Sequence, residues 1–142
     1  MPPVIRSYLP QDREPLVALW SQCELTRPWN DPYLDIDRKL AADGANLVVL
    51  ESGSELVGSV MVGYDGHRGW VNYLAVRPDH RGRGFGRLLM ADAERRLRAL
   101  GCAKLNLQVR GSNTAAIEFY RRLGFVVDDS VSLGLRLEHD AR

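Results

Sequence analysis

Apolar residues three and four positions apart predict a first helix over residues 11–25, with Leu16, Leu19 and Trp20 on one face. Prolines at positions 28 and 32 end this pattern. Further helices are predicted over residues 34–42, from the glycine-rich stretch 81–86 to about residue 100, and over 113–123. Short apolar runs predict strands at residues 4–8, 46–51, 55–64, 71–76, 104–109, 125–127 and 131–137. This order predicts one mixed α/β domain over residues 1–142, with about four helices flanking a sheet.

The composition is that of one soluble globular domain, with 142 residues, 45% apolar and 26% charged. Its 19 basic and 18 acidic side chains leave a formal charge of +1, so neither nucleic acid nor a membrane is expected as a partner. No apolar run approaches the length of a membrane span, and the N-terminus lacks the apolar core of a signal peptide. A cytoplasmic protein is expected. Cys23 and Cys102 show no metal-ligand spacing, and the histidines lie too far apart to suggest a metal.

The stretch 81–86 reads Arg-Gly-Arg-Gly-Phe-Gly, follows an apolar strand and opens a helix. Its glycines let the backbone approach a ligand closely and turn N–H groups toward it. The helix N-terminus behind them adds roughly half a positive charge, which favours a phosphate. Arg81, Arg83 and Arg87 add mobile positive charge. These features predict that a phosphorylated ligand binds here.

Two common phosphate-binding motifs are excluded. A Walker A loop continues Gly-Lys-Ser/Thr, whereas this stretch continues Arg87-Leu88-Leu89. The dinucleotide fingerprint needs a third glycine at position 87, and Asn106 stands where its acidic residue would fall. The spacing Arg-x-x-Gly-x-Gly after Leu-Ala-Val-Arg-Pro instead resembles the acetyl-CoA loop of the GNAT superfamily of acyl-CoA-dependent N-acetyltransferases.

This resemblance covers almost the whole chain and implies the GNAT fold, a mixed, largely antiparallel sheet with one splayed pair of parallel strands. Here the pair would be residues 71–76 and 104–109. The pantetheine arm of acetyl-CoA would enter between them and satisfy main-chain groups that the splay leaves unpaired. The resemblance assigns acetyl-CoA binding to Leu74, Ala75, Val76, Arg81, Gly82, Arg83, Gly84, Phe85, Gly86, Arg87, Asn113 and Tyr120.

A second motif lies in residues 113–125, which resemble the GNAT pattern Asn-x-x-Ala-x-x-x-Tyr-x-x-x-Gly-Phe/Tyr. Asn113 is expected at a helix N-cap, with Tyr120 two turns along the same face. The resemblance implies that the Tyr120 hydroxyl lies beside the acyl-CoA sulfur as the general acid, because a thiolate with a pKa of about 8.5 needs a proton as it leaves. The alternative is that Tyr120 belongs only to the apolar stripe of the helix.

The general base is not identified. An amine must be neutral to attack a thioester, while free lysine amines have a pKa of about 10.4. Acetyltransferases of protein N-termini in this superfamily often carry glutamate where this chain has Gln108, and an amide accepts no proton at neutral pH. A ribosomal-protein-type N-terminal acetyltransferase is therefore disfavoured. The base is left open among Glu24, Asp31, Asp65, His67 and Tyr73.

Two polar segments are candidates for the acceptor site. Residues 25–32 lie between the first two helices, a region that borders the acceptor in the GNAT arrangement, and residues 64–69 form a turn before the central strand. Together with residues 132–137 they are similar to the bacterial YpeA-type acetyltransferases. A rigid loop around a buried tryptophan is the structural alternative for the first segment. The acceptor-site candidates are Trp29, Asp31, Asp65 and His67.

The sequence therefore predicts an acyltransferase that moves an acetyl group from acetyl-CoA to a primary amine by direct attack in a ternary complex. No covalent intermediate is expected, since neither cysteine lies in an activating motif. A non-catalytic acyl-CoA-binding or sensing module is the alternative, because no base stands out. The acceptor, a small molecule or a peptide, is not identified, and association into a homodimer is left open.

Overall fold

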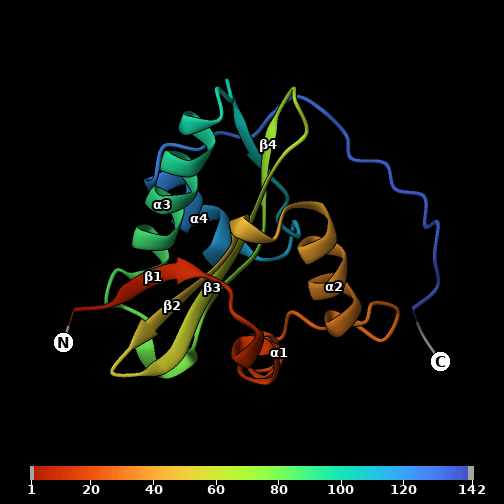
Figure 1. Ribbon diagram of the computed structural model, residues 1–142. Helices are drawn as coiled ribbons and strands as arrows, with labels where there is room; N and C mark the ends of the chain where they lie inside the picture. Colours follow the sequence, from red (N-terminus) through yellow and green to blue (C-terminus); the bar gives the residue numbers. More distant parts are fainter. Residues whose placement is uncertain (1, 141–142) are drawn as a thin grey trace.

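A computed structural model describes residues 2–140, which fold around one five-stranded sheet (Figure 1). The strands are β1 (Val4–Ser7), β2 (Leu47–Ser52), β3 (Glu55–Tyr64), β4 (Gly69–Val76) and β5 (Leu105–Leu107). The helices are α1 (Arg13–Gln22), α2 (Pro32–Asp43), α3 (Phe85–Ala99) and α4 (Thr114–Arg122), and short 3₁₀ turns form at Pro10–Asp12, Gly44–Asn46 and Pro78–His80. The strand order is β1-β2-β3-β4-β5, with every neighbouring pair antiparallel except β4 and β5, which are parallel. The predicted mixed α/β class is confirmed.

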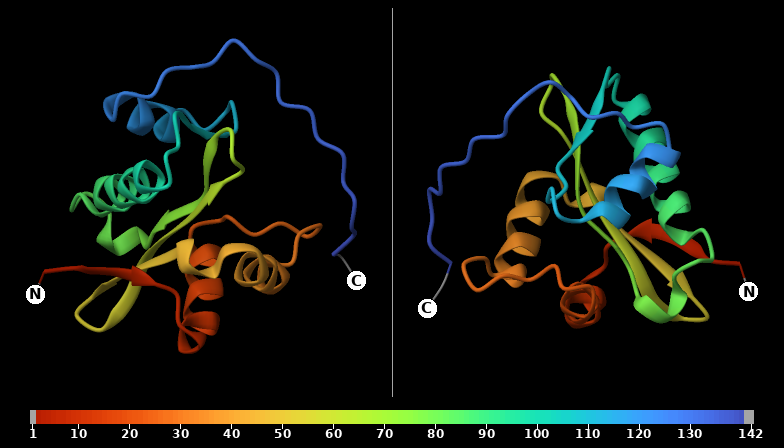
Figure 2. Two further views of the ribbon diagram at one scale, coloured as in Figure 1. Left: turned by 45° about the horizontal axis from the view of Figure 1, so that its top comes forward. Right: turned by 180° about the vertical axis from the view of Figure 1, so that it is seen from behind.

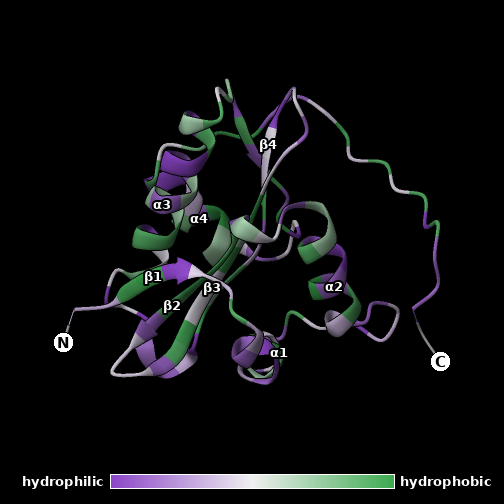
Figure 3. Ribbon diagram, in the orientation of Figure 1, coloured by the Kyte–Doolittle hydropathy of each residue, from purple (hydrophilic) through white to green (hydrophobic). Residues whose placement is uncertain are grey.

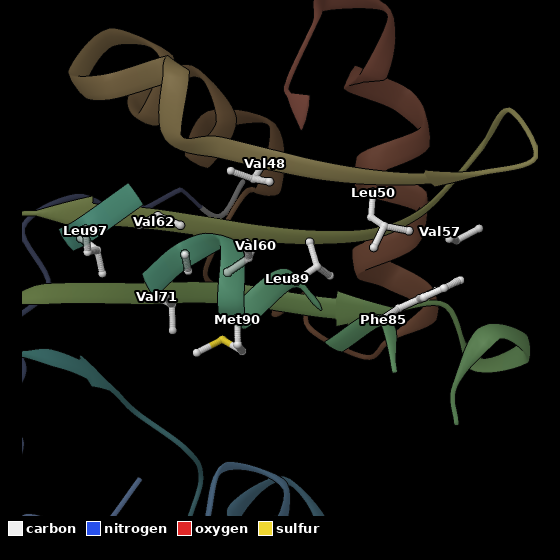
Figure 4. Close-up of a cluster of buried hydrophobic side chains, with 11 residues drawn as sticks. Val48, Leu50, Val57, Val60, Val62, Val71, Phe85, Leu89, Met90 and Leu97 are labelled. Carbon is white, nitrogen blue, oxygen red and sulfur yellow. The ribbon is translucent and has the colours of Figure 1, made fainter. Parts of the chain in front are cut away.

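Helices cover both faces of the sheet, with α3 and α4 on one face and α1 and α2 on the other (Figure 2). Successive residues of β2 point to opposite sides, so Val48 and Leu50 join the core under α3, whereas Leu47 and Val49 join the core under α1 and α2. Figure 4 shows the core under α3, where the helix contributes Phe85, Leu89, Met90, Ala93 and Leu97. A strand that is buried on both faces reads as a continuous apolar run, as β2 does.

The alternation of side chains is broken within β4. Between Asn72 and Ala75 this strand has one residue more than the part of β3 that pairs with it, so the register shifts. The shift occurs at Tyr73, whose φ of +52° lies in the left-handed region although it is not glycine. As a result Val71 and Tyr73, two positions apart, lie on opposite faces of the sheet, Val71 under α3 and Tyr73 against the core under α1 and α2.

A buried chain of hydrogen bonds holds this bulge. The indole Nε1–H of Trp20 donates to Ser59 Oγ (2.9 Å), and the Ser59 hydroxyl donates to the main-chain oxygen of Tyr73 (2.8 Å). The Trp20 ring also stacks on the Tyr73 ring, with centroids 3.8 Å apart. A left-handed backbone costs a bulky residue about 1–3 kcal/mol, so these contacts stabilise a conformation that Tyr73 would not adopt alone.

The strands β4 and β5 separate soon after they begin. Their pairing joins Gly69–Val71 to Leu105–Leu107, and the rest of β4, up to Val76, has no strand beside it on that side within residues 2–140. The splayed parallel pair is therefore confirmed. Beyond Val71 the main chain of β4 is open to an extended ligand, which can bond to it as a strand would.

Two predicted strands do not form, and those predictions were wrong. Residues 125–127 and 131–137 lie in an extended segment without strand pairing, which runs from the end of α4 past β5 toward α2 (Figure 2). An apolar alternation predicts side chains suited to a sheet, but it does not supply a neighbouring strand to bond with the main chain. The first helix is also shorter than predicted, because Pro10–Asp12 form a 3₁₀ turn before Arg13.

Ser59→Ala is expected to lower the free energy of unfolding by about 2–4 kcal/mol. The change removes the acceptor of the Trp20 indole and the donor to the Tyr73 carbonyl, and each buried group left unpaired costs about 1–3 kcal/mol. Urea unfolding measures the difference. Ser21→Ala on the exposed side of α1 is the control and should stay within about 0.5 kcal/mol of wild type. Equal small losses in both variants would show that these hydrogen bonds do not stabilise the bulge.

Candidate active site

The glycine-rich loop joins the end of β4 to α3. Gly82 and Gly84 both have a φ of +81°, and a Cβ atom at either position would meet nothing within 4 Å, so the main chain is open to a ligand. Gly84 is the N-cap of α3 and offers no side-chain cap. The first N–H groups of a helix have no acceptor within it, and they attract an anion. The loop and the helix therefore present donors suited to a phosphate.

The arginines of this loop differ in their contacts. Arg83 and Arg87 are exposed and can reach a bound anion. Arg81 instead donates its Nε–H to the main-chain oxygen of Val76 (3.0 Å), which ties the loop to the end of β4. Cys23 Sγ lies 3.3 Å from the same oxygen. A ligand that bonds to the Val76 oxygen would therefore compete with two existing donors.

Two other residues of the loop, Phe85 and Gly86, are packed against the rest of the protein. A Cβ atom at Gly86 would lie 3.1 Å from the ring of Phe119, so glycine permits the close approach of α3 to α4. Phe85 is buried in the core under α3. On β4, Ala75 is buried opposite Ser59 of β3, and Leu74 packs against the core under α3. Within the loop the main chain is thus open at Gly82 and Gly84, whereas Phe85, Gly86 and the end of β4 are packed against other parts of the fold.

Tyr120 lies on α4, on the same face of the sheet as α3. Its ring packs edge-on against Phe119 (centroids 5.1 Å apart) and Phe125 (5.6 Å). Burial raises the pKa of Tyr120 to about 12, so the hydroxyl carries its proton at neutral pH. Asn113 is the N-cap of α4, as predicted, and its side-chain oxygen accepts the N–H of Ala116 (3.2 Å).

A second tyrosine lies on the opposite face of the sheet. The Tyr73 hydroxyl donates to Asp35 Oδ2 on α2 (2.7 Å), and Asn30 Nδ2 donates to the same oxygen (2.5 Å). Burial and then the hydrogen bond to Asp35 raise the pKa of Tyr73, so this hydroxyl is also protonated at neutral pH. Asp35 is a candidate that sequence reasoning missed, because it occupies an ordinary polar position of a predicted helix. Only the fold brings it to Tyr73.

Trp29 and Asp31 lie in the loop before α2. Trp29 is 50% exposed, so the alternative of a loop around a buried tryptophan is wrong. Asp31 is the N-cap of α2 and accepts the N–H of Tyr33 (2.9 Å). An open pocket of about 260 Å³ lies beside these residues, and its lining includes Asn30, next to the hydrogen bonds of Asp35. The pocket thus borders the loop before α2, and its lining includes neither Tyr73 nor Asp35.

Asp65 and His67 lie elsewhere, in the turn that precedes β4 at the end opposite to Val76. Asp65 accepts the N–H groups of Arg68 (2.7 Å) and His67 (2.8 Å), and these bonds lower the pKa of its carboxyl. His67 is exposed. The four predicted acceptor-site residues therefore fall in two groups, and the turn with Asp65 and His67 is remote from the glycine-rich loop.

Across residues 2–140, no three His, Cys, Asp or Glu side chains gather in a way that could hold a metal ion. None of the helices of this same part is both long and apolar enough to cross a membrane.

Known proteins resemble this chain in sequence. The sequence model of the acetyltransferase (GNAT) family matches residues 14–125, which include the glycine-rich loop and α4. An acetyltransferase of Sodalis glossinidius is 50% identical over 137 residues, or 96% of each chain.

Two solved structures share the fold. The PaiA N-acetyltransferase of Thermoplasma acidophilum, solved in complex with coenzyme A, has a TM-score of 0.78 at 19% identity and is matched over 92% of this chain and 94% of its own. AAC(6')-Iy, solved with the bisubstrate analogue CoA-S-monomethyl-acetylneamine, has a TM-score of 0.78 at 21% identity over 96% and 99% of the two chains. At these identities the likeness establishes the fold alone.

If the pyrophosphate of coenzyme A binds at the N-terminus of α3, Gly84→Glu should weaken coenzyme A binding by at least about tenfold, since a carboxylate and a bulky side chain would occupy that position. Isothermal titration calorimetry measures the affinity. Gly101→Glu is the matched control, because Gly101 has the same φ of +81° and the same open surroundings but lies at the other end of α3. Its affinity should stay near that of wild type. Equal losses in both variants would point to strain rather than to a contact with the ligand.

Proposed function

The chain belongs to the acetyltransferase (GNAT) family, and from this membership we propose that it transfers the acetyl group of acetyl-CoA to a primary amine within a ternary complex. Its relatives are named acetyltransferases, so it is an acyltransferase rather than a binding module without catalysis. Acetyl-CoA as the donor is supported by the open loop before α3 and by the coenzyme A of the Thermoplasma protein. An amine acceptor is supported by AAC(6')-Iy, whose bisubstrate analogue joins coenzyme A to an acetylneamine group.

The observation that carries this proposal is a pair of protonated tyrosines on opposite faces of the sheet: Tyr73 on β4, two residues beyond the last pairing with β5, and Tyr120 on α4. Tyr120 packs with the core under α3, and Tyr73 packs with the core under α1 and α2. A thioester bound between β4 and β5 would have one hydroxyl on each side. The amine can then attack from the side of α2 while the thiolate leaves toward α4.

On the α4 side, Tyr120 is the proposed general acid. Its raised pKa, about 12, keeps the proton on the phenol until a thiolate develops beside it. The surrounding rings of Phe119 and Phe125 exclude water, so a hydrogen bond to the developing charge is stronger than it would be in solution.

On the α2 side, Tyr73 and Asp35 are the proposed route for the first proton of the ammonium. This proton passes to the Tyr73 oxygen while the Tyr73 proton passes to the Asp35 carboxylate, 2.7 Å away. The neutral nitrogen forms a bond to the acetyl carbon, the carbon–sulfur bond breaks, and the sulfur takes the proton of Tyr120. After the attack the nitrogen loses its second proton, which returns through solvent to the Tyr120 oxygen. Asp35 releases the first proton to solvent. Tyr73 touches the substrate, and Asp35 acts through it.

Tyr120→Phe is expected to lower kcat by roughly 10²–10⁴, the range for a positioned general acid. The Kd of acetyl-CoA should change little, because the neutral thioester sulfur is a weak acceptor and the bond forms mainly in the transition state. Thiol release with the best amine from a panel, beside a binding titration, separates the two quantities. A variant with wild-type turnover would leave Tyr120 only its packing role.

Asp35→Asn should lower kcat/KM for the amine by about 10²-fold at neutral pH, and the deficit should shrink as the pH approaches the pKa of the acceptor ammonium. At high pH more amine arrives neutral, so it needs no base. Tyr73→Phe should show the same trend. Asp37→Asn, an exposed carboxylate of the same helix that pairs with Arg13, is the control and should retain wild-type rates. A deficit that does not change with pH would mean that Asp35 is structural.

A further inference from the structure

The carboxylate of Asp140 lies in a site formed by α2 and the loop before it. Two nitrogens of the Arg38 guanidinium donate to its two oxygens, at 2.6 and 3.0 Å. The main-chain N–H of Asp31, the N-cap of α2, also donates to it (3.1 Å). The Asp140 side chain is only 2% exposed, and these donors hold the pKa of its carboxyl well below the usual range. Arg38 and the N-terminus of α2 thus form a site that binds a carboxylate, here called the carboxylate site.

The carboxylate site is connected to the Tyr73 hydroxyl through Asp35. One oxygen of Asp35 accepts the Tyr73 hydroxyl (2.7 Å), and the other accepts a hydrogen bond from Arg38 Nη1 (3.3 Å). Asn30, which precedes Asp31, donates to the Tyr73 oxygen (3.2 Å). A single carboxylate therefore separates the Arg38 guanidinium from the hydroxyl that is the proposed route for the proton of the amine.

The pocket of about 260 Å³ lies beside the carboxylate site. Its lining includes both Asp140 and Asn30. A volume of this size is below the usual range for drug-sized ligands, so it suits a small molecule. A small ligand whose carboxylate took the place of the Asp140 carboxylate would therefore have room beside it. The side chain of Asn30 would connect this ligand to Tyr73.

The segment that carries Asp140, residues 126–140, is extended and weakly held (Figure 1). Within the described chain no main-chain hydrogen bond joins residues 126–139 to the rest of the fold. Near α2 the segment is held by Asp140 and by Arg136, which donates to the main-chain oxygen of Trp29. Hydrophobic and hydrophilic residues alternate along it (Figure 3), and both kinds are exposed from residue 131 to 139.

A segment with so few contacts can detach from α2 by a local opening of low free energy. The Arg38 side chain is 47% exposed even with Asp140 in place, so water can solvate its guanidinium when Asp140 leaves. Exchange of one carboxylate for another at this site is therefore possible without unfolding α2.

We propose that the carboxylate site binds the carboxylate of the acceptor and that Asp140 occupies this site until the acceptor displaces it. The acceptor is then a small amine that also carries a carboxylate, such as an amino acid. This inference rests on the proposed function, because it names the class of amine that the reaction uses. An arginine fork recognises the planar carboxylate through two parallel hydrogen bonds, which a neutral amide cannot match. The bound carboxylate would hold the amine of the same molecule near Tyr73.

Acetylation of matched acceptors tests the class of amine. γ-Aminobutyrate and ε-aminocaproate are each compared with their own carboxamide, which keeps the amine and removes the negative charge. In wild type, kcat/KM should be at least about tenfold higher for the acid than for the amide of the better pair. Equal values for acid and amide would overturn the inference, whereas the proposed transfer to an amine would stand.

Arg38→Gln should bring the acid and the amide to within about twofold of each other, because the fork for the carboxylate is lost. The ratio of acid to amide within one variant cancels any effect of Arg38 on Asp35. Arg13→Gln is the matched control, since Arg13 pairs with Asp37 of the same helix, and it should keep the preference of wild type. A preference that survives in Arg38→Gln, or that is lost in Arg13→Gln, would overturn the assignment of the site.

Asp140→Ala tests whether Asp140 is the internal occupant. Removal of a tethered competitor should lower the KM of the preferred acid at least about threefold and leave the KM of its amide unchanged. Glu138→Ala removes the same charge from an exposed position of the same segment and should keep wild-type values. An unchanged KM in Asp140→Ala, or an equal fall for acid and amide, would overturn this part of the proposal.

A binding titration followed by NMR separates the site from the reaction. With coenzyme A present, γ-aminobutyrate should bind to the Asp140→Ala variant, and the further change Arg38→Gln should weaken this binding at least about tenfold. Equal affinities would overturn the carboxylate site. Binding that depends on Arg38, without acetylation of any amine tested, would support the site and contradict the proposed function. Equal thermal unfolding of all variants would exclude misfolding.

Discussion

Trp20, Ser59 and the main chain of Tyr73 form a buried chain of hydrogen bonds that keeps β4 bulged near the point where its pairing with β5 ends. The bulge reverses the alternation of side chains, so Tyr73 points toward α2 and shares its face with Ala75, while Leu74 and Val76 pack under α3. Without it, Tyr73 would share the face of Val71 and could not reach Asp35. A strained residue at this place, held by neighbours that are fully buried, supports a functional role for the bulge.

The same strand connects the two halves of the site. Its end carries the loop of Gly82 and Gly84, whose open main chain continues into the N-terminus of α3. Arg81 bonds back to the oxygen of Val76, so the loop is fixed relative to β4. A ligand with its phosphates on the loop would therefore extend along β4 toward the bulge, with α4 on one side and α2 on the other.

The sequence predicted most of the fold because the helical spacings, the hairpin around Gly53 and the N-cap at Asn113 are local signals. The motif of the glycine-rich loop is likewise local, and the structure gives this loop an open main chain at Gly82 and Gly84. The bulge at Tyr73 and the carboxylate of Asp35 were not predictable, because both depend on the contact of β4 with α1 and α2. The strands predicted after α4 did not form, since an apolar alternation does not say whether a partner strand is available.

A crystal structure of the complex with acetyl-CoA tests the central claim most directly. The account predicts that the pyrophosphate bonds to main-chain N–H groups of residues 82–87, that the pantetheine arm lies between β4 and β5, and that the thioester sulfur is within hydrogen-bonding distance of the Tyr120 hydroxyl. The acetyl group should lie between Tyr120 and Tyr73. A cofactor bound elsewhere, or a thioester with both tyrosines remote from it, would contradict the account.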